Sequence, residues 1–470
     1  MPASNLVIRG NKKYPDAMDR FKAEILTSSI FNHLKETNPA LLENFCSNKL
    51  NCIGGEITEI NFGLPEKKYL QLAESTDVFI NSAASVNFQE ELDKALLINT
   101  LCLNNVADFA EAAGDIPVIQ ISTCYVNGFN KGTIKEEISK PTGKRIPKDK
   151  NGHYDTNVVV KALQKKIEKT KASVKDKKLL PEALTELGLK EAHRYGWGDT
   201  YTFTKWLGEQ LILKRLNNKT ITILRPSVVE STLESPIPGW IEGVKVSDAI
   251  LLAYARQKVS FFPARKAGIV DIIPVDLVAN SVILSVAEAF EQPGEARIYQ
   301  SCSGSQNPLK VERYVTTVCE EVRVNWKKYP NLAKKQPEKK FVLVNKRVFI
   351  SVMKGLKLAQ TVHDRILSKS STKSKALKTV ESTLRLSSIY STYTSPEYVF
   401  NSDKLMALSN RMGEQDKVLF PVDAKKIDWD YYFQHIHVAG LNRYGMEDNT
   451  QVSKPTKSTA VKKEPETEEA

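Results

Sequence analysis

Tyr201 and Lys205 are the residues whose types and spacing point most directly to chemistry. They lie four apart in the run Tyr-Thr-Phe-Thr-Lys, and residues four apart on a helix share a face. We therefore expect the Lys205 ammonium to lie beside the Tyr201 phenol and to lower its pKa from a reference value of about 10. Such a tyrosine can pass a proton to a carbonyl oxygen that is accepting hydride. Thr123 follows an apolar run and would hold the same oxygen, with the Ser122 hydroxyl as the less favoured alternative.

Two further segments have the residue types of a ligand site. Residues 81–85 read Asn-Ser-Ala-Ala-Ser and follow the apolar run 78–80. Small side chains at a strand's carboxyl end let backbone amides approach a ligand, although a tight turn explains them equally well. Arg9 ends the first apolar run, where an arginine suits a 2′-phosphate and an acidic residue would suit a free ribose hydroxyl. This favours NADP(H) over NAD(H).

The elements that must position these residues alternate between strand-like and helix-like patterns over the first 300 residues or so. This alternation predicts an α/β fold with a doubly wound parallel sheet and helices on both faces. We expect strands at 6–8, 51–53, 77–80, 117–122, 221–224 and 269–273. Apolar residues at helical spacing predict helices over 16–35 and 92–113.

The chain divides into a dinucleotide-binding domain at 1–300, a mainly helical C-terminal region at 301–445 and a tail at 446–470. The domain contains a Lys-rich helical insertion at about 130–195, whose charges we interpret as a solvated face. The tail has almost no apolar residue, so we expect disorder there. Residues 341–362 predict a basic amphipathic helix. It would either pack on the core with one wet face or contact a membrane or an acyl chain.

Composition excludes several classes of protein. The 470 residues are 41% hydrophobic and carry 67 Lys and Arg against 55 Asp and Glu, a net charge of +12, which is typical of a soluble globular protein of several domains. The positive charge is spread along the chain, which suggests anionic ligands or a membrane surface and no nucleic acid. No apolar run reaches about 18 residues and no secretory signal precedes the first strand, so we expect a cytoplasmic protein.

Neither cysteines nor histidines show a metal-binding pattern. The six cysteines have no CxxC spacing and are expected to be buried, reduced thiols. His435 and His437 lie two apart, which does not place them on one face of a helix. We therefore expect no metal.

At this point the chain resembles the alcohol-forming fatty acyl-CoA reductases, an extended short-chain dehydrogenase/reductase family, and it looks closest to the bacterial members. The resemblance extends from about residue 5 to residue 444. The runs that carry it are LVIRGNKK (6–13), GEITE (55–59), VFINSAASVNF (78–88), IQISTCYVNG (119–128), YTFTK (201–205), LRPS (224–227), PIPGWIEG (236–243), DIIPVDLVAN (271–280) and LFPVDAKKIDW (419–429).

The resemblance implies roles for particular residues and a reaction. Tyr201, Lys205 and Thr123 match the catalytic acid, the lysine that also grips the nicotinamide ribose, and the catalytic hydroxyl. The implied reaction is NADPH-dependent reduction of long-chain fatty acyl-CoA to a fatty aldehyde and then to the alcohol, with the oligomeric state left open. The implied cofactor-binding residues are Arg9 at the 2′-phosphate, Glu56 and Ile57 on the adenine side, Ala83 and Ala84 along the cofactor, Asn99 supporting the lysine, and Pro226 and Ser227 beside the nicotinamide.

The chain departs from the family at its start. Members open with a strand and a GxxGxxG turn that holds the pyrophosphate, whereas the only glycine before Gly54 here is Gly10. Aligned on LVIRG, Met1 falls about 40 residues downstream of the family's beginning, so we expect the first strand and this turn to be missing. One explanation is that the start of the coding sequence was assigned too far downstream. The other is that the chain is a true fragment with a defective cofactor site.

Two other functions remain open. A reductase of this kind can stop at the aldehyde, and it would then consume one equivalent of NADPH instead of two. A cofactor-deficient remnant would bind acyl chains or a membrane through residues 341–362 without oxidising NADPH.

Overall fold

A computed structural model describes residues 4–367 and 393–446, together with residues 377, 380, 384 and 390. The expected disordered tail lies, beyond Met446, outside the described residues. None of the helices described is long and apolar enough to cross a bilayer.

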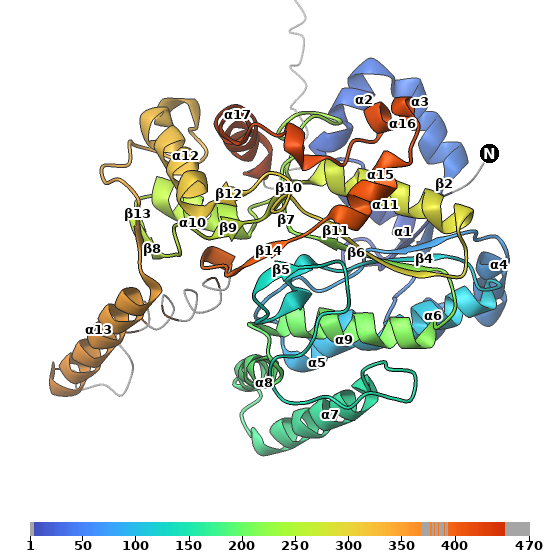
Figure 1. The fold of residues 1–470 in the computed structure, drawn as a ribbon, viewed down its shortest axis with the longest axis horizontal. Helices are drawn as coiled ribbons and strands as arrows, with labels where there is room; N and C mark the ends of the chain where they lie inside the picture. Colours follow the sequence, from blue (N-terminus) through green and yellow to red (C-terminus); the bar gives the residue numbers. More distant parts are fainter. Residues whose placement is uncertain are drawn as a thin grey trace, which may run out of the picture.

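The centre of the fold is a parallel sheet of four strands in the order β11-β6-β4-β3 (Figure 1). The strands are β3 (Phe79–Asn81), β4 (Val118–Ile121), β6 (Ile221–Pro226) and β11 (Ala296–Ser301). Every residue of β6 is buried, as expected for a strand with neighbours on both sides and helices on both faces. The predicted α/β class and the parallel sheet are confirmed.

A second parallel pair, β1 (Ser4–Ile8) and β2 (Leu50–Gly54), lies beside this sheet without joining it. Residues of β1 and of β3 line the same cavity, of about 590 Å³, so the two sheets face each other across an open slot. The described strands of this region therefore form two separate sheets with the slot between them. The edges of β1 and β3 that face the slot have no ladder partner among the described strands.

Helices cover both faces of the central sheet. On one face, α6 (Leu103–Ala112) and α9 (Thr200–Arg215) pack their apolar residues against β4 and β6. On the other, α11 (Val275–Glu291) and α15 (Asp403–Asn410) pack against β6 and β11. Figure 1 shows the central strands between these layers. The insertion forms α7 (Thr156–Ser173) and α8 (Leu180–Tyr195), which lie beyond α9.

Smaller strand pairs and helices make up the rest. Parallel pairs join β5 (Gly132–Ile134) to β14 (Tyr398–Phe400), β7 (Val228–Glu230) to β10 (Ile272–Pro274), and β8 (Phe261–Pro263) to β13 (Val342–Val344), while β9 (Ile269–Val270) and β12 (Leu309–Lys310) are antiparallel. Further helical segments include α2 (Asn32–Thr37), α3 (Pro39–Asn44), α4 (Glu66–Glu74), α5 (Leu92–Leu96), η5 (Leu97–Leu101), η6 (Cys124–Asn127), α10 (Val246–Ala255), α12 (Val311–Val324), α13 (Lys346–Leu367), α16 (Glu414–Leu419), α17 (Trp429–Tyr431) and η9 (Tyr432–His437). The region after residue 301 is mainly helical, as expected.

Three predicted elements differ from the structure. The helix expected over 16–35 is interrupted at Ser28, whose backbone is extended. The strand expected over 269–273 is two strands, because residues 269–270 pair with β12 and residues 272–274 pair with β7. The basic helix expected over 341–362 begins only at Lys346, because residues 342–344 pair with β8 as a strand.

A buried ion pair joins the central strand β6 to α9. Arg225 and Glu209 are both almost wholly inaccessible to solvent. The guanidinium donates to both carboxylate oxygens, at 2.9 and 2.6 Å, and also to the Glu137 carbonyl oxygen at 2.8 Å. This bidentate geometry satisfies the buried charges and sets how α9 lies on the sheet.

We expect Glu209→Gln to lower the free energy of unfolding by about 3–5 kcal/mol, because it leaves the buried Arg225 charge without its counter-charge. The surface pair between Arg215 and Asp108, at 2.7 Å, provides the control. Asp108→Asn should cost no more than about 1 kcal/mol. Urea denaturation measures the free energy of unfolding of both variants. An equal loss of free energy of unfolding in the two variants would contradict this role for the buried pair.

Candidate active site

The site is built on the first turn of α9. Asp199 caps this helix, since its carboxylate accepts hydrogen bonds from the backbone amide of Thr202 at 2.8 Å and from its hydroxyl at 3.0 Å. The cap fixes where the helix starts, so Tyr201 lies in its first turn and Lys205 one turn later. Gly208 brings the next turn against η5, because a Cβ there would lie 2.3 Å from the Asn99 carbonyl oxygen.

The Tyr201 side chain is directed toward Thr123 at the end of β4. The Thr123 hydroxyl favours the phenolate, but burial and the Asp199 carboxylate outweigh this effect and raise the pKa of Tyr201 well above its usual value. The Phe88 ring stands edge-on to the Tyr201 ring, with centroids 5.7 Å apart. The phenol is therefore held neutral, as a proton donor.

This environment contradicts the expectation that Lys205 lowers the pKa of Tyr201. The Lys205 ammonium instead donates to the Ile121 carbonyl oxygen at 2.6 Å. Burial lowers the pKa of Lys205 to about 8, against the opposing effect of Glu209. The nearby charge that acts on Tyr201 is the carboxylate of Asp199, which disfavours the phenolate. Helical spacing predicted the shared face correctly but not the direction in which the lysine side chain points.

Thr123 is the better-placed hydroxyl of the two expected candidates. Its Oγ1 lies 3.4 Å from the Pro226 carbonyl oxygen and accepts from the Tyr125 amide at 3.3 Å. Ser122 is equally buried, but its Oγ has no hydrogen-bond partner. Pro226 therefore lies next to Thr123, and Ser227 follows it as a buried residue whose amide donates to the Ser301 carbonyl oxygen at 3.0 Å.

Asn99 ties the small-residue loop to the catalytic helix. Its side-chain oxygen accepts from the Ser85 amide at 2.9 Å, and its side-chain nitrogen donates to the Ser85 carbonyl oxygen at 3.0 Å and to the Thr204 hydroxyl at 3.1 Å. The resemblance implied support for Lys205 itself. The structure shows instead a contact to the preceding residue, so Asn99 positions the loop and the helix relative to each other.

Five of the expected cofactor residues line one cavity. Arg9, Glu56, Ile57, Ala83 and Ala84 surround the slot of about 590 Å³ between β1 and β3. Arg9 lies just after β1, and its guanidinium is 70% exposed and pairs with Glu56 at 3.2 Å. Asn99, Lys205, Thr123, Pro226 and Ser227 are not among the residues that line this cavity.

The slot fits the adenine side of a nicotinamide dinucleotide. An exposed guanidinium can bind a phosphate, and the methyl groups of Ala83 and Ala84 leave room for a flat ligand. Gly10 does not supply a phosphate cradle, because a Cβ there would lie 2.3 Å from the Pro15 carbonyl oxygen of its own loop. The described residues thus provide one end of a cofactor site.

Comparison with known proteins decides the family. Residues 5–282 match the NAD-binding model described as male sterility protein, and residues 357–448 match a second model of that description, named Sterile. The chain is 32% identical over 461 residues to the chloroplastic fatty acyl-CoA reductase 2 of Arabidopsis thaliana, covering 93% of this chain and 73% of that protein. The chain belongs to the fatty acyl-CoA reductase family.

Another relative agrees with this assignment, and two solved structures share the fold. The alcohol-forming fatty acyl-CoA reductase of Simmondsia chinensis is 29% identical over 449 residues, covering 90% of this chain and 87% of that protein. The terminal reductase domain of the myxalamid biosynthetic pathway superposes with a TM-score of 0.55 at 15% identity, over 95% of this chain and 85% of that one. A reductase domain of a nonribosomal peptide synthetase from Mycobacterium tuberculosis superposes with a TM-score of 0.54 at 14% identity, over 95% of this chain and 86% of that one. At these identities the structures support the fold alone.

Three residues at this site were not predicted from the sequence. Asp199 sits two residues before Tyr201, and an acidic residue just ahead of a helix is a signal that could have revealed the cap. Phe88 lay within a run used for the resemblance but was given no role. Tyr393, whose hydroxyl donates to Asp199 at 3.0 Å, lies almost 200 residues along the chain, where no local pattern points to it.

We expect Lys205→Met to stabilise the protein at pH 7. The folded-state pKa of Lys205, about 8, lies below its reference of 10.5, so the folded state carries the full cost of the buried ammonium below pH 8. The free energy of unfolding should rise by roughly 2–3 kcal/mol at pH 7, and this increase should become smaller as the pH approaches the reference pKa of the lysine.

Urea denaturation between pH 7 and pH 10 tests this prediction. Lys214→Met is the control, because that lysine lies on the same helix with 35% of its side chain exposed. A gain for Lys205→Met that does not change with pH would contradict the assignment of the cost to the buried charge.

Proposed function

We propose that this protein reduces long-chain fatty acyl-CoA to the fatty alcohol, through a bound fatty aldehyde, with NADPH as the reductant. The observation that carries the proposal is the Tyr201 phenol, kept neutral in the first turn of α9 and beside Thr123 at the carboxyl end of β4. Open α/β sheets bind their ligands at this edge. Family membership supplies the substrate class, since the relatives named above are fatty acyl-CoA reductases.

Arg9 supports the choice of NADPH over NADH. Its guanidinium is largely exposed beside the slot and keeps free donors while it pairs with Glu56. A 2′-phosphate would add a second anion to this guanidinium. When bound, the cofactor supplies hydride to the carbonyl carbon of the substrate.

The protein's own groups manage the oxygen and its proton. Tyr201 and Thr123 donate hydrogen bonds to the carbonyl oxygen as negative charge develops on it. Breaking of the C–S bond re-forms the carbonyl and releases CoA, whose sulfur takes up a proton, and leaves the aldehyde. In the second reduction the aldehyde oxygen takes its proton from Tyr201, whose raised pKa keeps that proton available at neutral pH. Each reduction consumes one hydride and one proton.

An apolar cavity and a groove lie on the far side of the aromatic side chains that pack on this tyrosine. A cavity of about 70 Å³ is lined by residues of α10, α12 and β8 and by Tyr393. The Tyr393 ring packs on Phe88 at 5.3 Å, and Phe88 in turn packs on Tyr201. A groove of about 780 Å³ shares Ile250 and Phe262 with the cavity and opens beside α13. We assign the acyl chain to this cavity and groove because apolar walls would receive it without desolvating polar groups.

The exposed face of α13 extends this groove to a membrane. Phe349 and Met353 face the protein and line the groove. Val348, Val352 and Leu356 recur every four residues and are 50% exposed or more. Lysines at 354 and 357 lie on other sides of the helix, a pattern typical of helices that lie in a membrane interface. The proposal places the protein in the cytoplasm, with α13 against a membrane surface.

We expect Tyr201→Phe to lower kcat by at least about 100-fold while leaving the fold intact, because the proton donor is lost. The measurement is NADPH oxidation with palmitoyl-CoA together with product analysis. Tyr431→Phe provides a matched control, since Tyr431 is 57% exposed and outside the site. Unchanged turnover in Tyr201→Phe would remove this residue from the mechanism.

The wild-type assay also tests the remaining parts of the proposal. Two equivalents of NADPH per acyl-CoA and an alcohol product support it, whereas one equivalent and accumulated aldehyde would mean that the reaction stops halfway. Equal rates with NADH would contradict the role of Arg9. Binding of acyl-CoA without oxidation of either cofactor would favour a protein that only binds acyl chains.

We expect the double variant Val352→Asp/Leu356→Asp to bind vesicles containing phosphatidylserine about tenfold more weakly, because charge on the apolar face opposes insertion. Turnover of a short, water-soluble acyl-CoA should not change. Ile283→Asp/Phe290→Asp on α11 is the control, since these two residues are also about half exposed. Equal vesicle binding by both double variants would show that α13 is not the membrane contact.

A further inference from the structure

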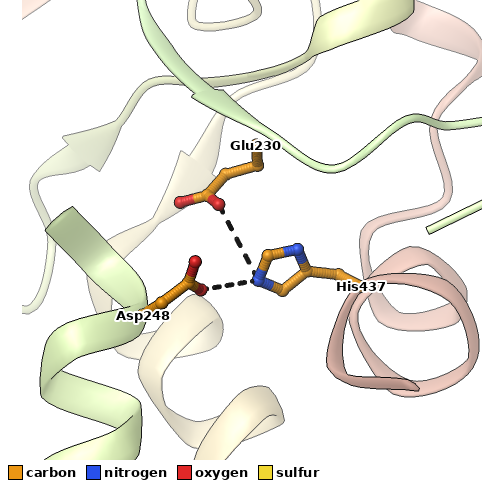
Figure 2. Close-up of side chains that lie close together, drawn as sticks. All are labelled: Glu230, Asp248 and His437. Atoms are coloured by element: carbon orange, nitrogen blue, oxygen red, sulfur yellow. Dashed lines mark hydrogen bonds and ion pairs between the residues drawn. The ribbon is translucent and has the colours of Figure 1, made fainter. Parts of the chain in front are cut away.

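A buried cluster of three ionisable residues lies outside the proposed site. Glu230 ends β7, Asp248 lies in the first turn of α10, and His437 ends η9 (Figure 2). All three side chains are wholly inaccessible to solvent. His437 Nε2 lies 2.9 Å from Asp248 Oδ1 and 3.9 Å from Glu230 Oε2, and one ligand atom from each residue lies within 4.8 Å of the others.

The outer atoms of these side chains are already held by hydrogen bonds. His437 Nδ1 lies 3.1 Å from the Ser231 hydroxyl, Asp248 Oδ2 accepts from the Lys245 amide at 3.1 Å, and Glu230 Oε1 accepts from the Ser247 hydroxyl. Each residue directs one further atom toward a common centre, where His437 Nε2 and Asp248 Oδ1 share a hydrogen bond, as Figure 2 shows. Metal-binding histidines and carboxylates in proteins are typically oriented by outer contacts of this kind.

Glu230 supplies an independent observation that favours a ligand at this cluster. Its Oε2 is buried, points into the cluster and has no hydrogen-bond partner. A buried carboxylate oxygen without a partner is costly. Two carboxylates and one neutral imidazole carry a charge of −2, which a divalent cation would balance. Ligand atoms around a tetrahedral ion with bonds of about 2.0–2.2 Å lie roughly 3–3.5 Å apart, and the distances of 2.9 and 3.9 Å from His437 Nε2 to the two carboxylate oxygens lie on either side of this range.

We propose that Glu230, Asp248 and His437 bind one divalent transition-metal ion, with zinc as the ion. One imidazole nitrogen and two carboxylate oxygens form a ligand set that zinc accepts, with a fourth position left for water or a neighbouring hydroxyl. Ser247 and Tyr314 lie at the cluster and also line the adjoining apolar cavity. The fourth ligand position therefore lies next to this cavity.

The ion would have a structural role. Glu230 and Asp248 belong to the segment that matches the NAD-binding model, and His437 to the segment that matches the Sterile model. One ion would thus join the two family segments, and this inference holds whether or not the proposed reaction is correct. Binding to the folded state alone would add directly to stability.

Metal analysis of the purified full-length chain tests the proposal. After expression in zinc-supplemented medium and gel filtration, we expect about one zinc ion per chain. Removal with a strong chelator should lower Tm by several degrees, and added zinc should restore it. Less than about 0.1 transition-metal ion per chain, with no zinc uptake in equilibrium dialysis, would overturn the proposal.

That negative result would favour a shared proton in place of a metal. Burial and the Asp248 carboxylate raise the pKa of Glu230 to about 8, so Glu230 could hold this proton at neutral pH. The wild-type measurement alone separates the two cases, so the test does not depend on any variant folding.

Variants locate the ion once it is found. His437→Gln and Glu230→Gln should each reduce zinc content at least about tenfold, whereas His435→Gln, on the exposed side of the same segment, should retain it. Full zinc content in His437→Gln would place the ion elsewhere and overturn the assignment. The visible spectrum of the cobalt-substituted protein gives a second reading, because loss of the imidazole ligand would change it.

Discussion

The active edge of this protein depends on how α9 is held against the sheet. The helix carries both Tyr201 and Lys205, so the position of each side chain is set by the position of the helix. Two constraints fix the helix at its middle: the buried pair of Glu209 with Arg225 on β6, and the close approach at Gly208. The buried pair satisfies its charges through two short hydrogen bonds. Because one member lies on the central strand, the pair sets α9 relative to the carboxyl ends of the strands, where Thr123 meets Tyr201.

Much of this arrangement could be predicted from the sequence, because strands and helices leave local periodic patterns. The parallel sheet and the shared face of Tyr201 and Lys205 follow from spacings of a few residues. Long-range contacts leave no such pattern. The Asp199 carboxylate and burial set the pKa of Tyr201, and Lys205 turned to the Ile121 carbonyl, so the expected pKa shift had the wrong sign. His437 was set aside because only its neighbour His435 was considered, whereas its hydrogen-bond partner Asp248 lies 189 residues away.

The split sheet explains why the cofactor residues form two groups. Arg9, Glu56 and Ala83 line the slot between β1 and β3, whereas Lys205, Thr123 and Pro226 lie at the ends of β4 and β6. Asn99 connects the groups, since it holds the loop after β3 to the turn that bears Lys205. The slot group therefore lies where the adenine side of a dinucleotide would bind, and the second group lies at the strand ends beside Tyr201.

The C-terminal region reaches the catalytic helix through aromatic side chains. Tyr393 donates to the same Asp199 carboxylate that caps α9 and raises the pKa of Tyr201. A change in how this region docks would therefore alter both the start of the helix and the proton affinity of the phenol. The same ring forms part of the apolar cavity wall and packs on Phe88. If the proposed acyl chain filled this cavity, it would contact Tyr393, the side chain that also donates to Asp199.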